Sequence, residues 1–170
     1  MPWSTSAAGT ARCWPRCWPP PRASRESCST PPRGSRAPPR SCGGPGLSDR
    51  CSIEAGDFFE AVPEGDVMLV KGVLHDWDDR RCTALLRSCR RSIAADGRLL
   101  VLEPVMPSSL GTPEAAGAVM SDIAMLVYTG GRERGMTEFR DLFAAAGFEL
   151  AEVTPPLGGS EVRVLVAKPA

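Results

Sequence analysis

Two apolar runs separated by an amphipathic segment constrain the fold of this chain more than any other feature. Residues 66–72 (DVMLVKG) and 98–105 (RLLVLEPV) are continuous apolar runs, which are typical of strands buried on both faces of a sheet. Between them, Asp78 or Asp79 can N-cap a helix that Gly97 would close. That helix would bury one stripe, which consists of Cys82, Leu85, Leu86, Cys89 and Ile93. A strand, a helix and a second strand in this order predict a parallel α/β sheet.

The neighbouring segments extend the same alternation. Residues 51–59 (CSIEAGDFF) predict a short strand that enters a polar turn, and residues 112–114 (TPE) have the residue types that begin a helix. Thr137 is predicted to cap a shorter helix over EFRDLFAAAG. Two closing strands, at 148–153 and 161–168, predict an antiparallel edge. The predicted fold is a three-layer α/β sandwich whose sheet is mostly parallel, with an antiparallel C-terminal strand.

The first 46 residues differ in composition from the rest of the chain. They hold seven arginines, one acid, ten of the seventeen prolines and four of the seven cysteines. The spacing of Cys13, Cys17, Cys28 and Cys42 matches no familiar zinc motif, and arginines beside Trp14 and Trp18 could contact single-stranded nucleic acid. We favour a disordered leader over residues 1–46 and one organised domain over residues 47–170. No bilayer-spanning run or signal peptide is recognisable, so a cytoplasmic location is expected, without nucleic-acid or membrane partners.

A frameshift in the gene is a further hypothesis for the leader. Translated one base earlier with G/C-rich codons, residues 4–20 can encode a strand, a glycine-rich turn and an apolar helix. In the same frame, ESCST can encode a strand that ends in an acid. These pieces would form the first half of a nucleotide-binding βαβ unit, with the frame restored near Gly46.

Candidate site residues follow three of the predicted strands. Open α/β sheets bind ligands beyond the carboxyl ends of their strands. Asp57 follows the first strand, the stretch from Lys71 to His75 follows the second, and Glu103 follows the third. His75 is the only histidine in the chain. The topology therefore predicts that these side chains gather at one edge of the sheet.

The chain resembles the S-adenosylmethionine-dependent O-methyltransferases of the plant caffeate and flavonoid type, whose bacterial relatives methylate aromatic polyketides. The resemblance is carried, in order, by GLSDR, AGDFFEAVPEGDVMLVKGVLHDWDD, GRLLVLEPVMP, SDIAMLVYTGGRER and EFRDLFAAAGF. It covers the chain from about Gly46 to the C-terminus and implies a Rossmann-like catalytic domain. The first strands of that domain, with their glycine-rich turn, are missing or degraded here. In the family an N-terminal domain forms the homodimer and covers the substrate pocket, and the resemblance, which starts near Gly46, leads us to expect that this domain is absent.

The resemblance implies a role for each candidate residue. His75 would be the general base, with Glu103 and Glu133 flanking it. S-adenosylmethionine would contact Asp57 and Phe58 at its adenine, and Lys71 from the end of a strand. The acceptor would lie beside Asp122 and Met125. No metal is expected.

Structural explanations stand beside these roles. A histidine at a strand–helix junction can simply cap or pack, and Glu103 can be a surface acid at a strand end. Asp76, Asp78 and Asp79 could bind a metal, although capping suits a helix start better. Gly130 and Gly131 can be a helix stop, and three methionines, Met120, Met125 and Met136, are interpreted first as core residues.

The sequence therefore predicts transfer of a methyl group from S-adenosylmethionine to a hydroxyl of an aromatic small molecule or polyketide in secondary metabolism. A phenol has a pKa near ~10 and imidazole near ~6.5, so His75 is expected to be a neutral base at pH 7. Two alternatives remain open. One is a relative that keeps the cofactor without methylating, and the other is an inactive truncated remnant that binds cofactor weakly or acts only as an interaction domain.

Overall fold

The computed structural model describes residues 26–30, 51–111, 115–158 and 160–170. The chain divides into two compact units, residues 1–63 and 64–170, and each is described by itself. The first unit contains two parallel strands, β1 (Glu26–Thr30) and β2 (Cys51–Ala55).

The strand β1 lies inside the segment that was predicted to be irregular. It falls in the stretch between Pro21 and Pro31, where every residue keeps a backbone N–H for pairing. The described residues include Cys28 but not the other leader cysteines, Trp14 or Trp18. They also do not include residues 4–20, on which the frameshift hypothesis rests.

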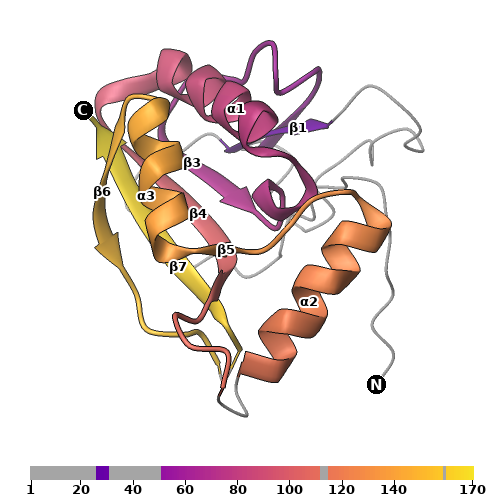
Figure 1. Ribbon diagram of the computed structural model, residues 1–170. Helices are drawn as coiled ribbons and strands as arrows, with labels where there is room; N and C mark the ends of the chain where they lie inside the picture. Colours follow the sequence, from indigo (N-terminus) through magenta and orange to yellow (C-terminus); the bar gives the residue numbers. More distant parts are fainter. Residues whose placement is uncertain (1–25, 31–50, 112–114, 159) are drawn as a thin grey trace. The chain divides into compact units, whose positions relative to one another are not determined.

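The second unit contains a mixed sheet with the strand order β3-β4-β7-β6 (Figure 1). The short strand β5 also pairs with β4 but is not part of this order. β3 and β5 run parallel to β4, whereas β7 is antiparallel to both β4 and β6. The predicted parallel pair and the antiparallel C-terminal strand are thus confirmed. The strands are β3 (Gly65–Lys71), β4 (Ile93–Met106), β5 (Arg134–Gly135), β6 (Phe148–Val153) and β7 (Val162–Pro169).

The helix α1 (Asp79–Ser92) forms where the sequence predicts it. Asp78 is its N-cap, and the Oδ1 atom of Asp78 accepts a 2.7 Å hydrogen bond from the backbone N–H of Arg81. The predicted stripe is buried. The end of the helix was predicted wrongly, because α1 stops at Ser92 and Gly97 lies inside β4.

The other two helices begin differently from the prediction. α3 (Met136–Ala145) is capped by Gly135, whose N–H donates to Oε2 of Glu138, so Thr137 lies in the first turn and is not the cap. α2 (Ala115–Tyr128) starts directly after residues 112–114, which lie outside the described residues. Met120 on α2 is 64% exposed and is not a core residue, while Met125 and Met136 are half-buried. Within the described ranges, no helix is both long and apolar enough to cross a membrane.

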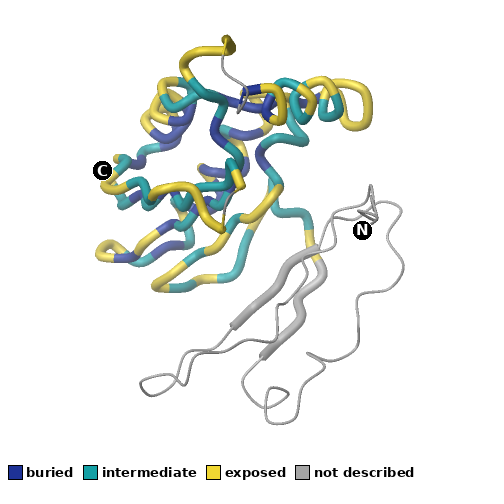
Figure 2. The backbone as a smooth tube through the Cα atoms, turned by 90° about the horizontal axis from the view of Figure 1, so that it is seen from below, coloured by how far each residue is buried: buried dark blue, intermediate teal, exposed yellow. Residues whose placement is uncertain are grey.

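The core of the second unit includes the sheet face that carries Leu99 and Val101, together with buried residues of α1 and α3. These two helices lie side by side (Figure 1), and the buried segments gather inside the unit (Figure 2). Phe139 and Phe143 of α3 are buried there with their rings stacked. The opposite face is more open, because Val67 and Leu69 of β3 are each 62% exposed. The prediction that this run is buried on both faces was therefore wrong. β3 is an edge strand of the second unit, so it lacks a neighbour on one side.

Candidate active site

A short turn places His75 between β3 and α1, at the junction predicted from the sequence. The chain leaves β3 through Gly72, whose φ of +61° favours glycine. A single 3₁₀ turn, η1 (Leu74–Asp76), follows and carries the histidine. Leu74 is fully buried and anchors the turn, while the imidazole keeps 20% of its surface exposed. The imidazole is therefore mostly enclosed but still in contact with solvent.

Glu103 lies directly against this imidazole. The Nδ1 atom of His75 is 2.9 Å from Oε2 of Glu103, and the carboxylate is completely buried. The other oxygen, Oε1, accepts 2.8 Å hydrogen bonds from the backbone N–H groups of Val73 and Leu74. Glu103 was expected beyond the end of its strand, but it is a residue of β4 itself. One oxygen of this carboxylate thus lies in ionic contact with the ring, and the other holds the turn that carries it.

Glu133 approaches the same ring nitrogen from the segment between α2 and β5. Its Oε1 atom lies 3.9 Å from Nδ1 of His75 and accepts a 2.7 Å hydrogen bond from the Ser121 hydroxyl. The backbone N–H of Glu133 donates to Oδ1 of Asp122 at 2.8 Å. Asp122, expected beside the acceptor, therefore holds the backbone of a flanking acid. The structure brings His75 and Glu103 together, as the topology predicted, and Glu133, which the resemblance implied, lies beside them.

The charged surroundings change the protonation of His75. Burial by itself lowers its pKa, but the contact with Glu103 and the charges of Glu133 and Asp76 outweigh burial and raise the pKa from 6.5 to about 9. A group with this pKa is about 99% protonated at pH 7. The expectation of a neutral imidazole at pH 7 therefore does not hold for the chain without ligands.

This pKa can be measured directly, because the chain has one histidine. We expect the imidazole NMR signals to titrate near pH 9 and not near 6.5. Because the folded pKa is raised, the associated stabilisation is complete below about pH 6.5 and is lost as the pH rises through about 9. Denaturant unfolding of the parent and of His75→Gln at pH 6 and pH 9.5 should therefore converge at the higher pH. A midpoint at or below 6.5 would contradict the described contact.

The cluster carries more negative than positive charge. Burial raises the pKa of the Glu133 and Asp76 carboxyls, although the neighbouring imidazole opposes that rise. The Oε2 atom of Glu133 is buried and has no hydrogen-bond partner among the described residues. A buried carboxylate oxygen without a partner is costly, so this position favours a further donor or a cation.

The three aspartates near the helix start serve separate purposes. Asp78 caps α1, Asp76 lies 3.8 Å from Nε2 of His75, and Asp79 pairs with two arginines, Arg132 and Arg134. Those arginines lower the pKa of Asp79, although burial acts in the opposite direction. Among the residues that the structure describes, no group of three or more potential ligands could hold a metal ion.

The segment 131–134 supplies contacts that the sequence analysis missed. The backbone N–H of Arg132 donates to the carbonyl of His75, and the buried guanidinium of Arg134 binds the carbonyls of Leu74 and Trp77. A Cβ atom on Gly131 would clash with the His75 carbonyl, so this glycine does more than stop a helix. Of the charged residues in GRER, only Glu133 was predicted to have a role, because an arginine in a charged run is usually solvated.

Four other residues were predicted to belong to the site. Lys71 is exposed at the last position of β3, and Met125 is half-buried on α2. Asp57 and Phe58 belong to the first unit, where Oδ1 of Asp57 accepts a hydrogen bond from Phe59. Their cofactor and substrate roles stay predictions.

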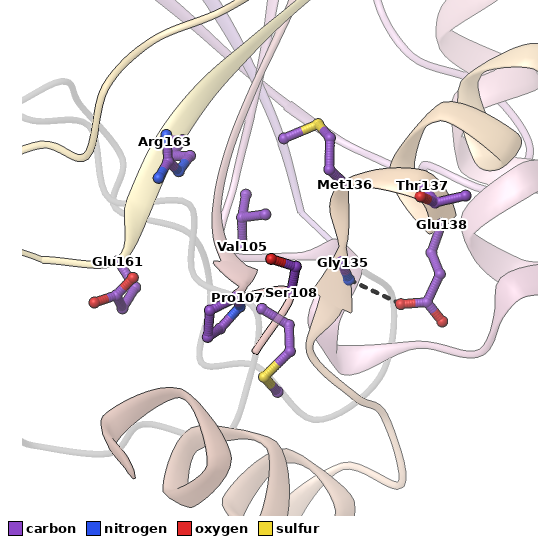
Figure 3. Close-up of a pocket in the computed structure, with 10 residues that line it drawn as sticks. Val105, Pro107, Ser108, Gly135, Met136, Thr137, Glu138, Glu161 and Arg163 are labelled. Carbon is purple, nitrogen blue, oxygen red and sulfur yellow. Dashed lines mark hydrogen bonds between the residues drawn. The ribbon is translucent and has the colours of Figure 1, made fainter. Parts of the chain in front are cut away.

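A separate pocket of about 530 Å³ lies past the carboxyl end of β4 (Figure 3). Its walls come from the end of β4, the start of α3 and the start of β7, and include Val105, Glu138 and Arg163. His75 does not line it. Sequence patterns gave no sign of this pocket, which forms only when the three segments meet.

Comparison with known proteins identifies the family of this chain. A family model for the O-methyltransferase domain matches residues 35–149. The chain belongs to this family. The match begins upstream of Gly46, where the sequence resemblance was placed, so part of the leader is included in it. The predicted family is confirmed.

Individual O-methyltransferases support the same conclusion. Phenazine O-methyltransferase of Lysobacter antibioticus is 44% identical over 69% of this chain and 34% of its own length. O-demethylpuromycin-O-methyltransferase of Streptomyces alboniger is 36% identical over 81% of this chain and 37% of its own length. The solved structure of an O-methyltransferase from neocarzinostatin biosynthesis, in complex with S-adenosylmethionine and 2-hydroxy-5-methyl naphthoic acid, is 33% identical with a TM-score of 0.63. That alignment covers 74% of this chain and 35% of the solved one. The chain thus spans about a third of the length of these relatives.

Proposed function

We propose that this chain carries the proton-accepting part of an O-methyltransferase that transfers a methyl group from S-adenosylmethionine to a hydroxyl of an aromatic small molecule or polyketide. The observation that supports this most directly is the 2.9 Å contact between His75 and the buried Glu103, in a chain of this family. His75 is the proposed general base. Glu103 and Glu133 are proposed to fix its orientation and to stabilise the imidazolium that forms.

The raised pKa of His75 suits a phenolic acceptor. Proton transfer from a phenol with a pKa near ~10 to an imidazole with a pKa of about 9 is almost balanced in free energy. The neutral form of His75 is scarce at pH 7, but it is a stronger base than a free imidazole. General-base catalysis works best when strength and availability are balanced, and contributes about 10²–10⁴-fold. We therefore expect turnover to increase with pH above neutrality.

The acids around His75 fit a cationic cofactor. S-adenosylmethionine supplies an electrophilic methyl group on a positively charged sulfur. The partnerless Glu133 oxygen and the excess of carboxylates favour a positive charge nearby, and a cation there would lower the pKa of His75 toward neutrality. We propose that Lys71, Asp57 and Phe58 contact the remainder of the cofactor, and that Asp122 and Met125 lie on the acceptor side. A cytoplasmic homodimer stays a prediction.

Calorimetry followed by a transfer assay tests this function. We expect the full chain to bind S-adenosylmethionine with measurable heat. It should then methylate at least one member of a panel of naphthols, hydroxynaphthoic acids and hydroxyphenazines, detected by mass spectrometry. S-adenosylhomocysteine should bind more weakly at pH 7 if the acids favour the sulfonium charge. Binding without transfer would favour a non-methylating relative, and absence of binding would favour an inactive remnant.

A further inference from the structure

Arg134 lies beneath the His75 turn and contacts both of its ends. Its side chain is only 1% exposed. One terminal nitrogen donates to the carbonyl of Leu74 and the other to the carbonyl of Trp77, each at 2.7 Å. These two carbonyls bracket His75. We propose that Arg134 is a positioning residue, which holds the turn so that the imidazole stays against Glu103 and Glu133.

The turn needs such external support. η1 is a single 3₁₀ turn, and its N-cap residue, Val73, makes no side-chain capping bond. Turns of this length have poor internal hydrogen bonding, so their carbonyls depend on other partners. The thiol of Cys82 also contacts the Leu74 carbonyl, at 3.1 Å, but a thiol is a weak donor. The charged guanidinium is therefore the strongest donor described on this side of the turn.

Only an arginine fits this arrangement. The planar guanidinium has five N–H donors in a fixed fork, so it can bind two carbonyls and a carboxylate at once. Here the third partner is Asp79, whose Oδ1 lies 3.0 Å from Nε of Arg134. A lysine has one compact ammonium group and cannot span the two carbonyls in the same way. Arg134→Lys therefore keeps the charge and removes the geometry.

The same segment also sets the position of Glu133. The Arg132 N–H donates to the His75 carbonyl at 2.9 Å, and Gly131 packs so closely that any side chain there would meet the backbone of His75 and Asp76. Glu133 lies between the two arginines. Its distance from the imidazole is therefore tied to the same contacts that hold the turn.

Two roles for Arg134 predict opposite changes at His75. If the arginine acted only through its positive charge, its removal would raise the pKa of His75. If it positions the ring, the imidazole would move away from Glu103, Glu133 and Asp76, and its pKa would fall toward 6.5. The sign of the change distinguishes the two roles without any enzyme assay.

The experiment is an NMR titration of the full chain with isotope-labelled histidine, in the parent, Arg134→Lys and Arg134→Met. We expect the parent to titrate near 9 and both variants to titrate at least roughly one pH unit lower. Arg90→Lys is the matched control. Arg90 lies in the last turn of α1, is half-buried, and donates a hydrogen bond to the backbone carbonyl of Gly147. This variant should titrate like the parent. An unchanged or raised pKa in folded Arg134→Lys would overturn the proposal.

Asp79→Asn decides the matter if both Arg134 variants fail to fold. Asp79 is 55% exposed, so its replacement is tolerated more easily, yet it loosens the third contact of Arg134. We expect a smaller fall in the pKa of His75, and an unchanged value would count against positioning. The role of Arg134 in turnover rests on the proposed function. If that function holds, kcat should fall in Arg134→Lys while the KM for the acceptor changes little. A parent chain without methyl transfer would refute the function and leave the titration result standing.

Discussion

His75→Ala is expected to lower kcat/KM for methyl transfer by about 10²–10⁴-fold while leaving the affinity for S-adenosylmethionine within a few-fold of the parent. The imidazole is the proposed proton acceptor, and it keeps 20% of its surface exposed while Glu103 contacts its Nδ1 atom. Its removal deletes the base but keeps Lys71, Asp57 and Phe58, which are proposed to contact the cofactor. Calorimetry gives the affinity, and an initial-rate assay gives kcat/KM.

The pH dependence separates a base from a residue that only packs. In the parent, kcat/KM for S-adenosylmethionine should rise about tenfold per pH unit and level off near pH 9, because this parameter reports the pKa of the enzyme without bound cofactor. In His75→Ala the residual rate should lack this inflection. His75→Gln provides a second variant that keeps polarity and approximate size. Equal kcat/KM in parent and variants would remove His75 from the chemistry.

The sequence predicted the parts of this site that local patterns and topology determine. Asp78 is recognisable as a helix cap because a short acceptor precedes the amphipathic stripe that starts at Cys82. The approach of His75 to Glu103 follows from parallel pairing of β3 and β4, which aligns their carboxyl ends. Neither inference requires knowledge of side-chain packing.

Other features depend on distances that no sequence pattern contains. The protonation state of His75 was predicted wrongly because it depends on three acids at 2.9–3.9 Å, of which two come from distant segments. Arg134 was missed because arginine is normally a surface residue, and only the folded chain shows that two carbonyls need its guanidinium. Helix ends were misplaced at Gly97 and Thr137, where the true boundaries are set by β4 and by the Glu138–Gly135 contact.

Glu103→Gln is the second change with a large expected effect, and it should act on turnover far more than on stability. The amide keeps an oxygen that can accept from the N–H groups of Val73 and Leu74, so the turn retains its support. Its NH₂ group would then face Nδ1 of His75, which would have to accept a hydrogen bond. The neutral ring would then carry its proton on Nε2, the nitrogen that faces away from Glu103. That nitrogen could no longer accept a proton from the acceptor hydroxyl. Where a carboxylate orients a catalytic imidazole, the same replacement costs about 10⁴-fold in kcat.

Glu103→Ala provides the contrast that makes this prediction specific. Alanine leaves two N–H donors of a part-buried turn without their acceptor, at about 1–3 kcal/mol for each donor. It should therefore lose stability as well as turnover, whereas Glu103→Gln should lose mainly turnover. Glu149→Gln, at an exposed acid paired with Lys168, is the control and should match the parent in both measurements. Kinetics report turnover, and denaturant unfolding reports stability. The ¹⁵N shifts of the single histidine report which ring nitrogen carries the proton. If Glu103→Gln turned over like the parent, the carboxylate would have a structural role only, and the base would have to be oriented by Glu133 alone.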